Sequence, residues 1–385
     1  MKIGVIGLNK VGLSFSLLCD NTGYNVIGFD KDSNLIFNLK SSKYPNDDVG
    51  IFKLLLEKKT IEFNSDENYV IQNSEIIFVF TSPKDNIEGK IDTTELFSVV
   101  NTFYELSTSN VDIHNKKLVI CGLTNMGDVS LINERLKPFN TQVAYFPQFI
   151  MEGNIINTLK NPNVLIIGTE NKDIFDSIVS IFTKIKSGDI SAYMMSLTSA
   201  EIARMAINSH SVINKNFANM IGELLVKTGQ SNEINLVLSA LDLKTKQDSK
   251  IFDYGFGIGG PILPKDNRLL SKYIDLLGFT HNIPKYMDEF NKEYGNNLKT
   301  LYKKINPDKT VPFVIDSLSY EKNKNSTEES QRLRLCLELL EDGYIVNIIE
   351  NDTMIKELQH LSVEYGGRLK FYTKDTNPKG IKIDL

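Results

Sequence analysis

Cysteine is scarce in this sequence. The 385 residues include three cysteines, Cys19, Cys121 and Cys336, which lie far apart, with no CxxC pair and no histidine cluster beside them. A disulfide framework uses several paired cysteines, and structural zinc sites use clustered Cys or His ligands. We therefore expect reduced thiols, as in a cytoplasmic protein, and no metal site.

Long apolar runs are also missing. No stretch approaches the roughly 20 apolar residues of a membrane-spanning helix. The apolar N-terminal segment resembles a signal peptide, but Lys10 interrupts it and no small-residue cleavage site follows. The sequence therefore predicts a cytoplasmic protein without a membrane partner.

The sequence has no excess of positive charge. It contains 43 Lys and Arg against 48 Asp and Glu, which gives a net charge of -5 at pH 7. Nucleic acids attract proteins that carry clustered positive charge, so we expect no nucleic-acid partner. The content of 41% hydrophobic and 24% charged residues is typical of a soluble globular protein. The length suffices for two or three domains of roughly 100 to 200 residues each.

Short apolar runs alternate with helical patterns in the first half of the chain. This alternation predicts the α/β class, with a Rossmann-like, doubly wound parallel sheet and crossover helices. The strand candidates are residues 2–7, 24–30, 75–80, 117–122, 142–146 and 163–168.

The pattern changes near residue 196. Thr198 and Glu201 have the spacing of a capping box for a long helix that ends near Gly229. A helical segment continues to about residue 300, and strand candidates at 307–316 and 344–352 then flank a helix at 327–341. We therefore predict three domains, in which a central helical segment separates two Rossmann-like units. Their ranges are 1–195, 196–300 and 301–385.

The first predicted turn has the pattern of a dinucleotide-binding loop. Residues 7–12 read GLNKVG, which is G-x-G-x-x-G with Asn9 in place of the middle glycine. That position usually lacks a side chain so that the backbone can approach a pyrophosphate on the helix N-terminus. Asp30 follows Gly12 by 18 residues, where a carboxylate binds the adenosine ribose and repels a 2'-phosphate.

The loop therefore predicts NAD rather than NADP as cofactor. Thr81, after another predicted strand, would reach the same edge of the sheet. The alternative, an α/β crossover that binds no nucleotide, stays open because one glycine is missing. The candidate cofactor residues from this pattern are Gly7, Asn9, Lys10, Val11, Gly12, Asp30 and Thr81.

Four stretches carry a resemblance to a known family. They are residues 1–13, 146–168, 198–209 and, most specifically, GFGIGGPILPKDNRLL at 255–270. With these motifs the chain resembles the UDP-glucose/GDP-mannose dehydrogenase family along essentially its full length. The resemblance implies an NAD-binding first domain, a central domain for dimerisation and substrate loops, and a C-terminal domain that binds a nucleotide sugar.

The resemblance also implies a reaction that this sequence cannot complete. Such enzymes oxidise a sugar's primary alcohol to a carboxylate with two NAD, through a thioester on a cysteine. Ile262 occupies the position of that cysteine. Gln148 replaces the carboxylate that manages the hydrolytic water, and Arg204 replaces the active-site lysine. The family's loop threonine aligns with Leu123, although Thr124 is adjacent.

Other residues of the implied site are retained. Glu152, Asn208, Lys265 and Asp266 match the family, so its scaffold remains while its reactive centre does not. The implied catalytic candidates are Asn208, Asp266, Arg204, Gln148 and Glu152. Glu152 and Lys265 join the cofactor candidates. The substrate candidates are Phe149, Arg204, Asn208, Tyr254, Gly255, Phe256, Gly257 and Gly259.

Several of these residues also have simpler interpretations. The glycines of segment 255–260 either form a cradle for a nucleotide sugar or make a tight turn without a ligand. Tyr254 either stacks on a base or belongs to the core. His210, on the long helix, is either an acid or base or a surface residue. Glu321 and Glu328 stand where the family has a Lys and an Arg facing phosphates.

Two functions follow as hypotheses. The first is an NAD-dependent oxidoreductase that acts on a CH–OH group of a UDP- or related nucleotide sugar in a single two-electron step, with water, Glu152 or His210 as proton acceptor. The second is a catalytically inactive family member that serves as a nucleotide-sugar-binding, regulatory or assembly protein. The resemblance further implies a homodimer built on the long helix and a place in surface-polysaccharide synthesis.

Overall fold

The computed structural model describes residues 1–44, 49–81, 90–109, 111–150, 153–245, 252–322 and 324–383. These residues form two compact units, Met1–Arg204 and Met205–Leu385. Glu152, predicted as a catalytic and cofactor residue, lies outside the described residues. The division into three domains stays a prediction.

The first unit contains an eight-stranded sheet in the order β3-β2-β1-β4-β5-β6-β7-β8. Its buried strands coincide with the predicted apolar runs, which confirms the α/β class. The two short edge strands β3 and β8 were not predicted, because neither has a long apolar run. The strands are β1 Lys2–Ile6, β2 Asn25–Phe29, β3 Glu62–Asn64, β4 Ile76–Val79, β5 Lys117–Ile120, β6 Gln142–Tyr145, β7 Leu165–Gly168 and β8 Ala192–Met195.

The predicted parallel sheet is confirmed as the dominant arrangement, and one pair of neighbouring strands departs from it. β6 and β7 pair antiparallel, with Tyr145 opposite Gly168, whereas the other neighbours are parallel. The connection between them carries α7, Ile155–Lys160, which packs on α1, Lys10–Asn21. The chain thus returns to the sheet from the side of α1 without crossing it, and the direction of β7 is reversed.

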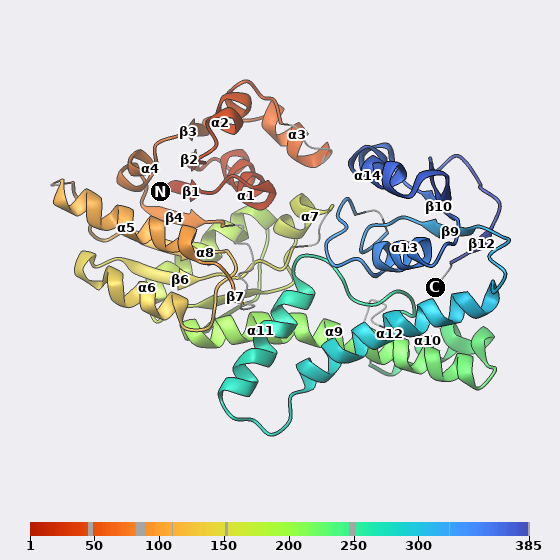
Figure 1. Ribbon diagram of the computed structural model, residues 1–385. Coiled ribbons are helices and arrows are strands. Elements are labelled where there is room, and N and C mark those ends of the chain that lie inside the picture. Colours follow the sequence, from red (N-terminus) through yellow and green to blue (C-terminus); the bar gives the residue numbers. More distant parts are fainter. Residues whose placement is uncertain are drawn as a thin grey trace. The chain divides into compact units, whose positions relative to one another are not determined.

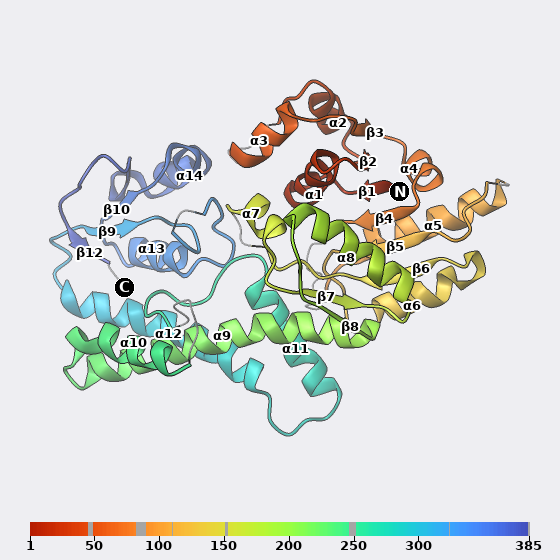
Figure 2. The same cartoon turned by 180° about the vertical axis from the view of Figure 1, so that it is seen from behind.

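Helices cover both faces of this sheet (Figures 1 and 2). One apolar core joins the sheet to α1, α2, α3, α7 and α8, and a second core on the opposite face joins it to α4, α5 and α6. This doubly wound arrangement places the loops after the parallel strands at one edge of the sheet. The helices not yet located are α2 Ser33–Lys40, α3 Val49–Leu56, α4 Glu67–Asn73, α5 Thr94–Thr108, α6 Asp128–Leu136 with a 3-10 turn at Lys137–Phe139, and α8 Lys172–Lys186.

The long helix α9, Leu197–Lys227, begins differently from the prediction. Ser196 caps it, since its Oγ accepts a hydrogen bond from Ser199 N at 3.2 Å. Glu201 bonds instead to Gly127, far away in the sequence, so the predicted capping box is wrong. The predicted end is confirmed, because Gly229 adopts a φ of 79° just after the helix.

The second unit combines helices with a smaller parallel sheet of order β11-β10-β9-β12. β9 begins later than predicted because Pro312 has no N–H for the ladder. The elements are α10 Ile234–Thr245, α11 Leu263–Leu276, α12 Ile283–Ile305, β9 Phe313–Asp316, α13 Gln331–Glu341, β10 Val346–Ile349, α14 Asp352–Tyr365, β11 Leu369–Tyr372 and β12 Ile381–Lys382, with 3-10 turns at Ser231–Glu233 and Gly366–Arg368.

The two sheets share one turn geometry. In the first unit Gly7, just after β1, has a φ of 89°, and Leu8 N donates to Asp30 Oδ2 at 2.9 Å. In the second unit Ser317, just after β9, has a φ of 68°, and Leu318 N donates to Glu350 Oε2 at 2.9 Å. In each unit an acidic residue fixes the loop after the neighbouring strand: Asp30, directly after β2, fixes the loop after β1, and Glu350, directly after β10, fixes the loop after β9.

None of the helices in the described ranges combines the length and the apolar character needed to cross a lipid bilayer.

The buried Glu350 clamp gives a test of stability. Glu350 is 1% exposed and accepts hydrogen bonds from Leu318 N, Ser317 Oγ and Asn351 N. Glu350→Ala leaves these buried donors without an acceptor, which should lower the free energy of unfolding by about 3 kcal/mol. Urea unfolding followed by circular dichroism measures this change.

The matched control is Glu341→Ala, which removes an exposed glutamate at the end of α13. It should change the free energy of unfolding by less than about 0.5 kcal/mol. Equal effects of the two substitutions would contradict a structural role for the Glu350 carboxylate.

Candidate functional site

Asn9 caps α1 with its own side chain. Its backbone is extended, with φ −60° and ψ 175°, and its Oδ1 accepts from Val11 N at 3.1 Å and from Gly12 N at 3.0 Å. Its Nδ2 donates to Phe80 O at 3.1 Å. A pyrophosphate on this helix would use N–H groups of the same turn. The Asn9 side chain therefore competes with a phosphate for them.

The two retained glycines are required by close backbone contacts. A Cβ on Gly7 would lie 2.1 Å from Phe80 O, and a Cβ on Gly12 would lie 2.0 Å from Gly7 O. Neither position accepts a side chain without movement of the backbone. The turn thus keeps the tight geometry of a dinucleotide loop, whatever occupies it.

Asp30 lies at the same edge of the sheet as this turn. Its Oδ2 accepts from Leu8 N at 2.9 Å and its Oδ1 accepts from Asp32 N at 3.0 Å. The side chain is partly exposed, and each carboxylate oxygen has a second lone pair. Asp30 can therefore hold the loop and still accept hydrogen bonds from a ribose.

Two further loops begin at this edge, one after β4 and one after β5. Thr81 follows β4, and a Cβ on Gly122, after β5, would lie 2.3 Å from Thr81 Oγ1. The structure thus brings together the predicted residues Gly7, Asn9, Gly12, Asp30 and Thr81. Their donors and acceptors fit a dinucleotide, with the Asn9 cap as the one departure.

Gln148 and Phe149 come after β6 in the first unit. Gln148 Nε2 donates to Phe146 O at 3.1 Å, so the amide bonds to its own loop. Phe149 is half-buried and packs against the apolar core below α5 and α6. Arg204, on α9, is 4% exposed.

The cysteines of the chain are buried. Cys121 is 6% exposed, and Cys19 and Cys336 are fully covered. Burial raises the pKa of the Cys19 and Cys121 thiols well above the usual value, and raises that of Cys336 to about 12. These thiols are protonated at neutral pH, so none supplies a nucleophilic thiolate.

In the second unit Asn208 and Asp266 are brought together. Asn208 Nδ2, on α9, donates to Asp266 Oδ2 in the first turn of α11, and Asp266 is completely buried. Ile262 is the N-cap residue of α11, and its aliphatic side chain cannot cap the helix with a hydrogen bond. Lys265 Nζ forms an ion pair with Glu328 Oε1 at 2.8 Å.

The glycine segment 255–260 is held by side chains of the same unit. Gly255 N donates to Asn219 Oδ1 at 3.0 Å, Gly257 N to Gln331 Oε1 at 2.6 Å, and Ile258 N to Asn291 Oδ1 at 2.7 Å. A Cβ on Gly259 would lie 2.6 Å from Glu329 O. The segment is therefore packed tightly, and its N–H groups at these three positions are already bonded.

Tyr254, Phe256 and His210 occupy different surroundings. The Tyr254 ring lies over Gly222 on α9, where a Cβ would come within 2.1 Å of it. The Phe256 ring is buried, with the Arg332 guanidinium 4.7 Å from its centre. His210 is exposed on α9 near the Asn214 amide. These contacts favour a packing role for both aromatic residues.

Comparison with known proteins identifies the family. Residues 1–186 match the NAD binding domain of the UDP-glucose/GDP-mannose dehydrogenase family, and residues 198–293 match its central domain. The chain belongs to this family.

Individual relatives agree with this assignment. A UDP-glucose 6-dehydrogenase of Rickettsia bellii is 23% identical over 362 residues, covering 91% of this chain and 81% of the relative. The solved UDP-glucose dehydrogenase of Pyrobaculum islandicum has a TM-score of 0.84 at 19% identity, covering 96% of this chain and 85% of that one. The UDP-D-ManNAc dehydrogenase of Pyrococcus horikoshii has a TM-score of 0.77 at 17% identity, covering 100% and 99%. At these identities the structures show a shared fold.

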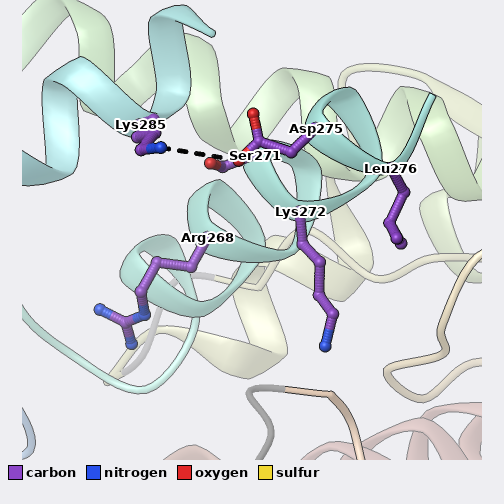
Figure 3. Close-up of a pocket in the computed structure, with 6 residues that line it drawn as sticks. All are labelled: Arg268, Ser271, Lys272, Asp275, Leu276 and Lys285. Atoms are coloured by element: carbon purple, nitrogen blue, oxygen red, sulfur yellow. Dashed lines mark ion pairs between the residues drawn. The ribbon is translucent and has the colours of Figure 1, made fainter. Parts of the chain in front are cut away.

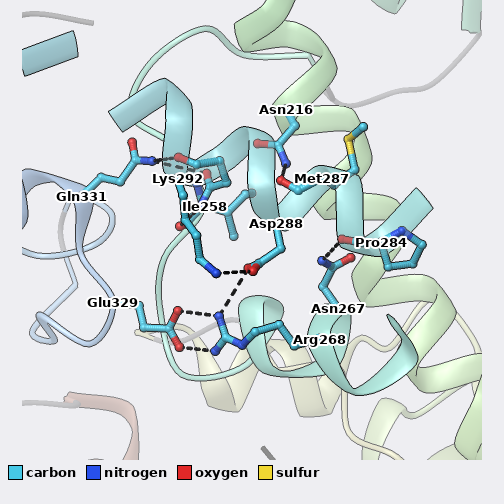
Figure 4. A network of polar contacts seen from close by, with 11 residues as sticks. Asn216, Ile258, Asn267, Arg268, Pro284, Met287, Asp288, Lys292, Glu329 and Gln331 are labelled. Atoms are coloured by element: carbon cyan, nitrogen blue, oxygen red, sulfur yellow. Dashed lines mark hydrogen bonds and ion pairs between the residues drawn. The ribbon is translucent and has the colours of Figure 1, made fainter. Parts of the chain in front are cut away.

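A polar network that sequence reasoning missed surrounds α11 in this family member. Arg268 contacts Glu329 at 2.9 Å and Asp288 at 3.5 Å, and Lys292 contacts Asp288 at 2.7 Å (Figure 4). Gln331, also drawn in Figure 4, accepts the hydrogen bond from Gly257 N in the glycine segment. Asp288 and Lys292 are an i,i+4 pair within α12. The contacts of Arg268 with Glu329 and Asp288 join separate segments, so no local motif could have revealed those two.

Two of the cavities among the described residues lie in the second unit. One, of about 410 Å³, lies beside α11 and is lined by Arg268, Ser271, Lys272, Asp275, Leu276 and Lys285 (Figure 3). The other, of about 460 Å³, lies at the carboxyl edge of the smaller sheet and includes Asp316, Lys322, Lys374 and Lys382. None of the predicted site residues lines either cavity. Within the described ranges no cluster of three or more His, Cys, Asp or Glu has metal-site geometry.

The burial of the cysteines predicts their chemical behaviour. A disulfide reagent such as DTNB should modify less than one thiol per native chain at neutral pH, because thiolates are scarce and shielded. After unfolding in guanidinium chloride all three cysteines should react. Rapid stoichiometric reaction of one thiol in the native protein would reveal an accessible nucleophile.

Proposed function

We propose that this protein binds NAD and a nucleotide sugar and oxidises one CH–OH group of the sugar in a single two-electron step. The partly exposed carboxylate of Asp30, beside the turn of Gly7 and Gly12, is the observation that carries the proposal. A 2'-phosphate would meet this negative charge, which supports NAD over NADP. Lys10, Val11 and Thr81 complete the cofactor set, and Glu152 and Lys265 are added from the family pattern.

NAD, when bound, supplies the hydride acceptor for the alcohol carbon. The chain's own residues position the sugar and receive a proton. Asn208 and Asp266 would hold the reacting oxygen, and Arg204 would add a fixed positive charge, although it does not donate its proton. Water, Glu152 or His210 accepts the proton, so that the alcohol loses a hydride and a proton and becomes a carbonyl.

A second oxidation to a uronic acid is not part of this proposal. It needs a nucleophile to convert the carbonyl to a tetrahedral adduct, and Ile262 has no lone pair for that bond. The three thiols are buried with raised pKa values. Gln148 cannot exchange a proton with a hydrolytic water.

The names of the relatives indicate the substrate class. They are dehydrogenases of UDP-glucose and of UDP-D-ManNAc, so a UDP sugar is the first candidate. We assign its binding to Phe149, Arg204, Asn208, Tyr254 and the segment from Gly255 through Phe256 and Gly257 to Gly259. We also propose the three-domain division at residues 195 and 300, a homodimer on α9, a cytoplasmic location and a role in polysaccharide synthesis.

The alternative is a catalytically inactive family member that binds a nucleotide sugar and acts in regulation or assembly. The Asn9 cap favours it, because the amides of Val11 and Gly12 are already bonded. The internal hydrogen bonds of Gly255, Gly257 and Ile258 favour it in the same way.

Calorimetry with NAD and with UDP-glucose, combined with NADH absorbance, tests the two functions. Binding of both ligands with one NADH formed per sugar is the expected result. Two NADH per sugar would restore the four-electron reaction. Sugar binding without NAD binding would leave the inactive alternative.

Asp30→Ala supplies the matched comparison for NAD binding. Loss of the ribose acceptor should weaken NAD at least about tenfold. Asp176→Ala, which removes an exposed carboxylate on α8, should leave the affinity unchanged. An unchanged affinity in Asp30→Ala would remove the basis for the cofactor assignment.

Asn9→Gly tests whether the cap competes with the cofactor. It releases the N–H groups of Val11 and Gly12 and should tighten NAD binding about threefold to tenfold. Because glycine is also tolerated as a helix N-cap, the free energy of unfolding should fall by only about 0.5 kcal/mol. Weaker NAD binding after this substitution would show that Asn9 itself contacts the cofactor.

A further inference from the structure

Glu201 connects α9 to the loop that follows β5. It lies in the first turn of α9 and is only 2% exposed. Its Oε2 accepts from Gly127 N at 2.7 Å, and its Oε1 accepts from Val129 N at 3.2 Å and from Thr124 Oγ1 at 3.4 Å. One buried carboxylate therefore accepts from two donors of the loop after β5, Thr124 and Gly127, and from one donor in the first turn of α6, Val129.

This carboxylate acts as the N-terminal cap of α6. Gly127, the N-cap residue, has a φ of 94° and no side chain to satisfy the first N–H groups of the helix. A helix N-terminus favours a nearby negative charge and an oxygen acceptor. Glu201 supplies both from a different element. Locally, Asn125 N donates to Asp128 Oδ2 at 2.9 Å, so the cap from α9 adds a long-range contact to a local one.

The loop in question, residues 121–127, belongs to the candidate cofactor edge. It begins at the carboxyl end of β5, and its Gly122 lies against Thr81. Ligands of such sheets bind outside the carboxyl ends of the strands. A displacement of this loop would therefore change the surface that a dinucleotide meets.

Two protonation states of Glu201 hold the loop differently. An ionised carboxylate accepts from both N–H groups, whereas a protonated carboxyl turns one oxygen into a donor that faces an N–H. The pKa of Glu201 is raised to about 7, mainly by burial and to a smaller extent by the Asp128 carboxylate, while the hydrogen bonds from Gly127 and Val129 act in the opposite direction. The other charged group on the same helix turn is Arg204. The carboxylate therefore loses its charge as the pH falls through neutrality.

We propose that Glu201 is a positioning residue that holds loop 121–127 for dinucleotide binding, and that proton uptake by its carboxyl weakens this binding. The inference rests on the proposed binding of NAD. It adds a long-range cap, and a dependence on pH, to the cofactor edge.

The test compares NAD affinity at about pH 6 and about pH 8.5 by calorimetry. The unaltered protein should bind NAD about threefold to tenfold more weakly at the lower pH, since one charge-assisted hydrogen bond is lost. Glu201→Gln carries an amide that cannot accept from both N–H groups. It should bind weakly at both pH values, with no pH dependence.

Glu134→Gln is the matched control, because it changes an exposed glutamate on α6 that pairs with Lys137 at the surface. It should keep both the affinity and the pH dependence. A flat pH profile in the unaltered protein, or an unchanged profile in Glu201→Gln, would overturn the inference.

Amide hydrogen exchange of residues 123–129 separates this inference from the cofactor proposal. The Gly127 and Val129 amides should be protected in the unaltered protein at about pH 8.5 and lose protection in Glu201→Gln, with Glu134→Gln as reference. Equal protection in both variants would contradict the positioning role. If the unaltered protein binds no NAD at either pH, the proposed function fails, and the exchange data still decide whether Glu201 holds the loop.

Discussion

Both α/β units depend on one carboxylate that directly follows the second strand of the unit in chain order, β2 in the first unit and β10 in the second. A positive φ just after the first strand turns the chain sharply, and the next N–H then points to the neighbouring strand end. Asp30 accepts this N–H in the first unit and Glu350 accepts it in the second. The clamp fixes the loop at the edge where ligands of such sheets bind.

The two clamps differ in what remains available to a ligand. Glu350 is 1% exposed and binds Ser317 and Asn351 as well, so its oxygens serve the fold. Asp30 is partly exposed and, within the described ranges, accepts hydrogen bonds from Leu8 N and Asp32 N. The same geometry therefore yields a structural carboxylate in one unit and an accessible one in the other. This difference supports the assignment of the cofactor to the first unit.

The sequence predicted the features that depend on neighbouring residues. Buried strands have continuous apolar runs, and Gly7 and Gly12 belong to a short pattern whose close contacts exclude side chains. It did not predict Glu201 as the cap of α6 or Gln331 as the acceptor for Gly257, because both bonds join residues more than 70 positions apart. The antiparallel β7 was missed for a similar reason, since its direction depends on where α7 packs. Asn9 was recognised as a departure, but its role as a cap needed the structure.

The ion pair at the start of α11 shows how an acidic neighbour changes the chemistry of a lysine. The resemblance predicts that Lys265 is retained and that Glu328 stands in place of an arginine. In the structure Lys265 Nζ forms an ion pair with Glu328 Oε1 at 2.8 Å. Next to it, Glu329 pairs with Arg268. Each acid lowers the positive potential that a diphosphate would meet, and a ligand phosphate would have to compete with a carboxylate already in contact. A retained lysine is therefore weak evidence for retained phosphate binding unless its partner is also known. The same reasoning applies to Asn208 and Asp266, which bond to each other, so that a substrate oxygen would join a pair that is already formed.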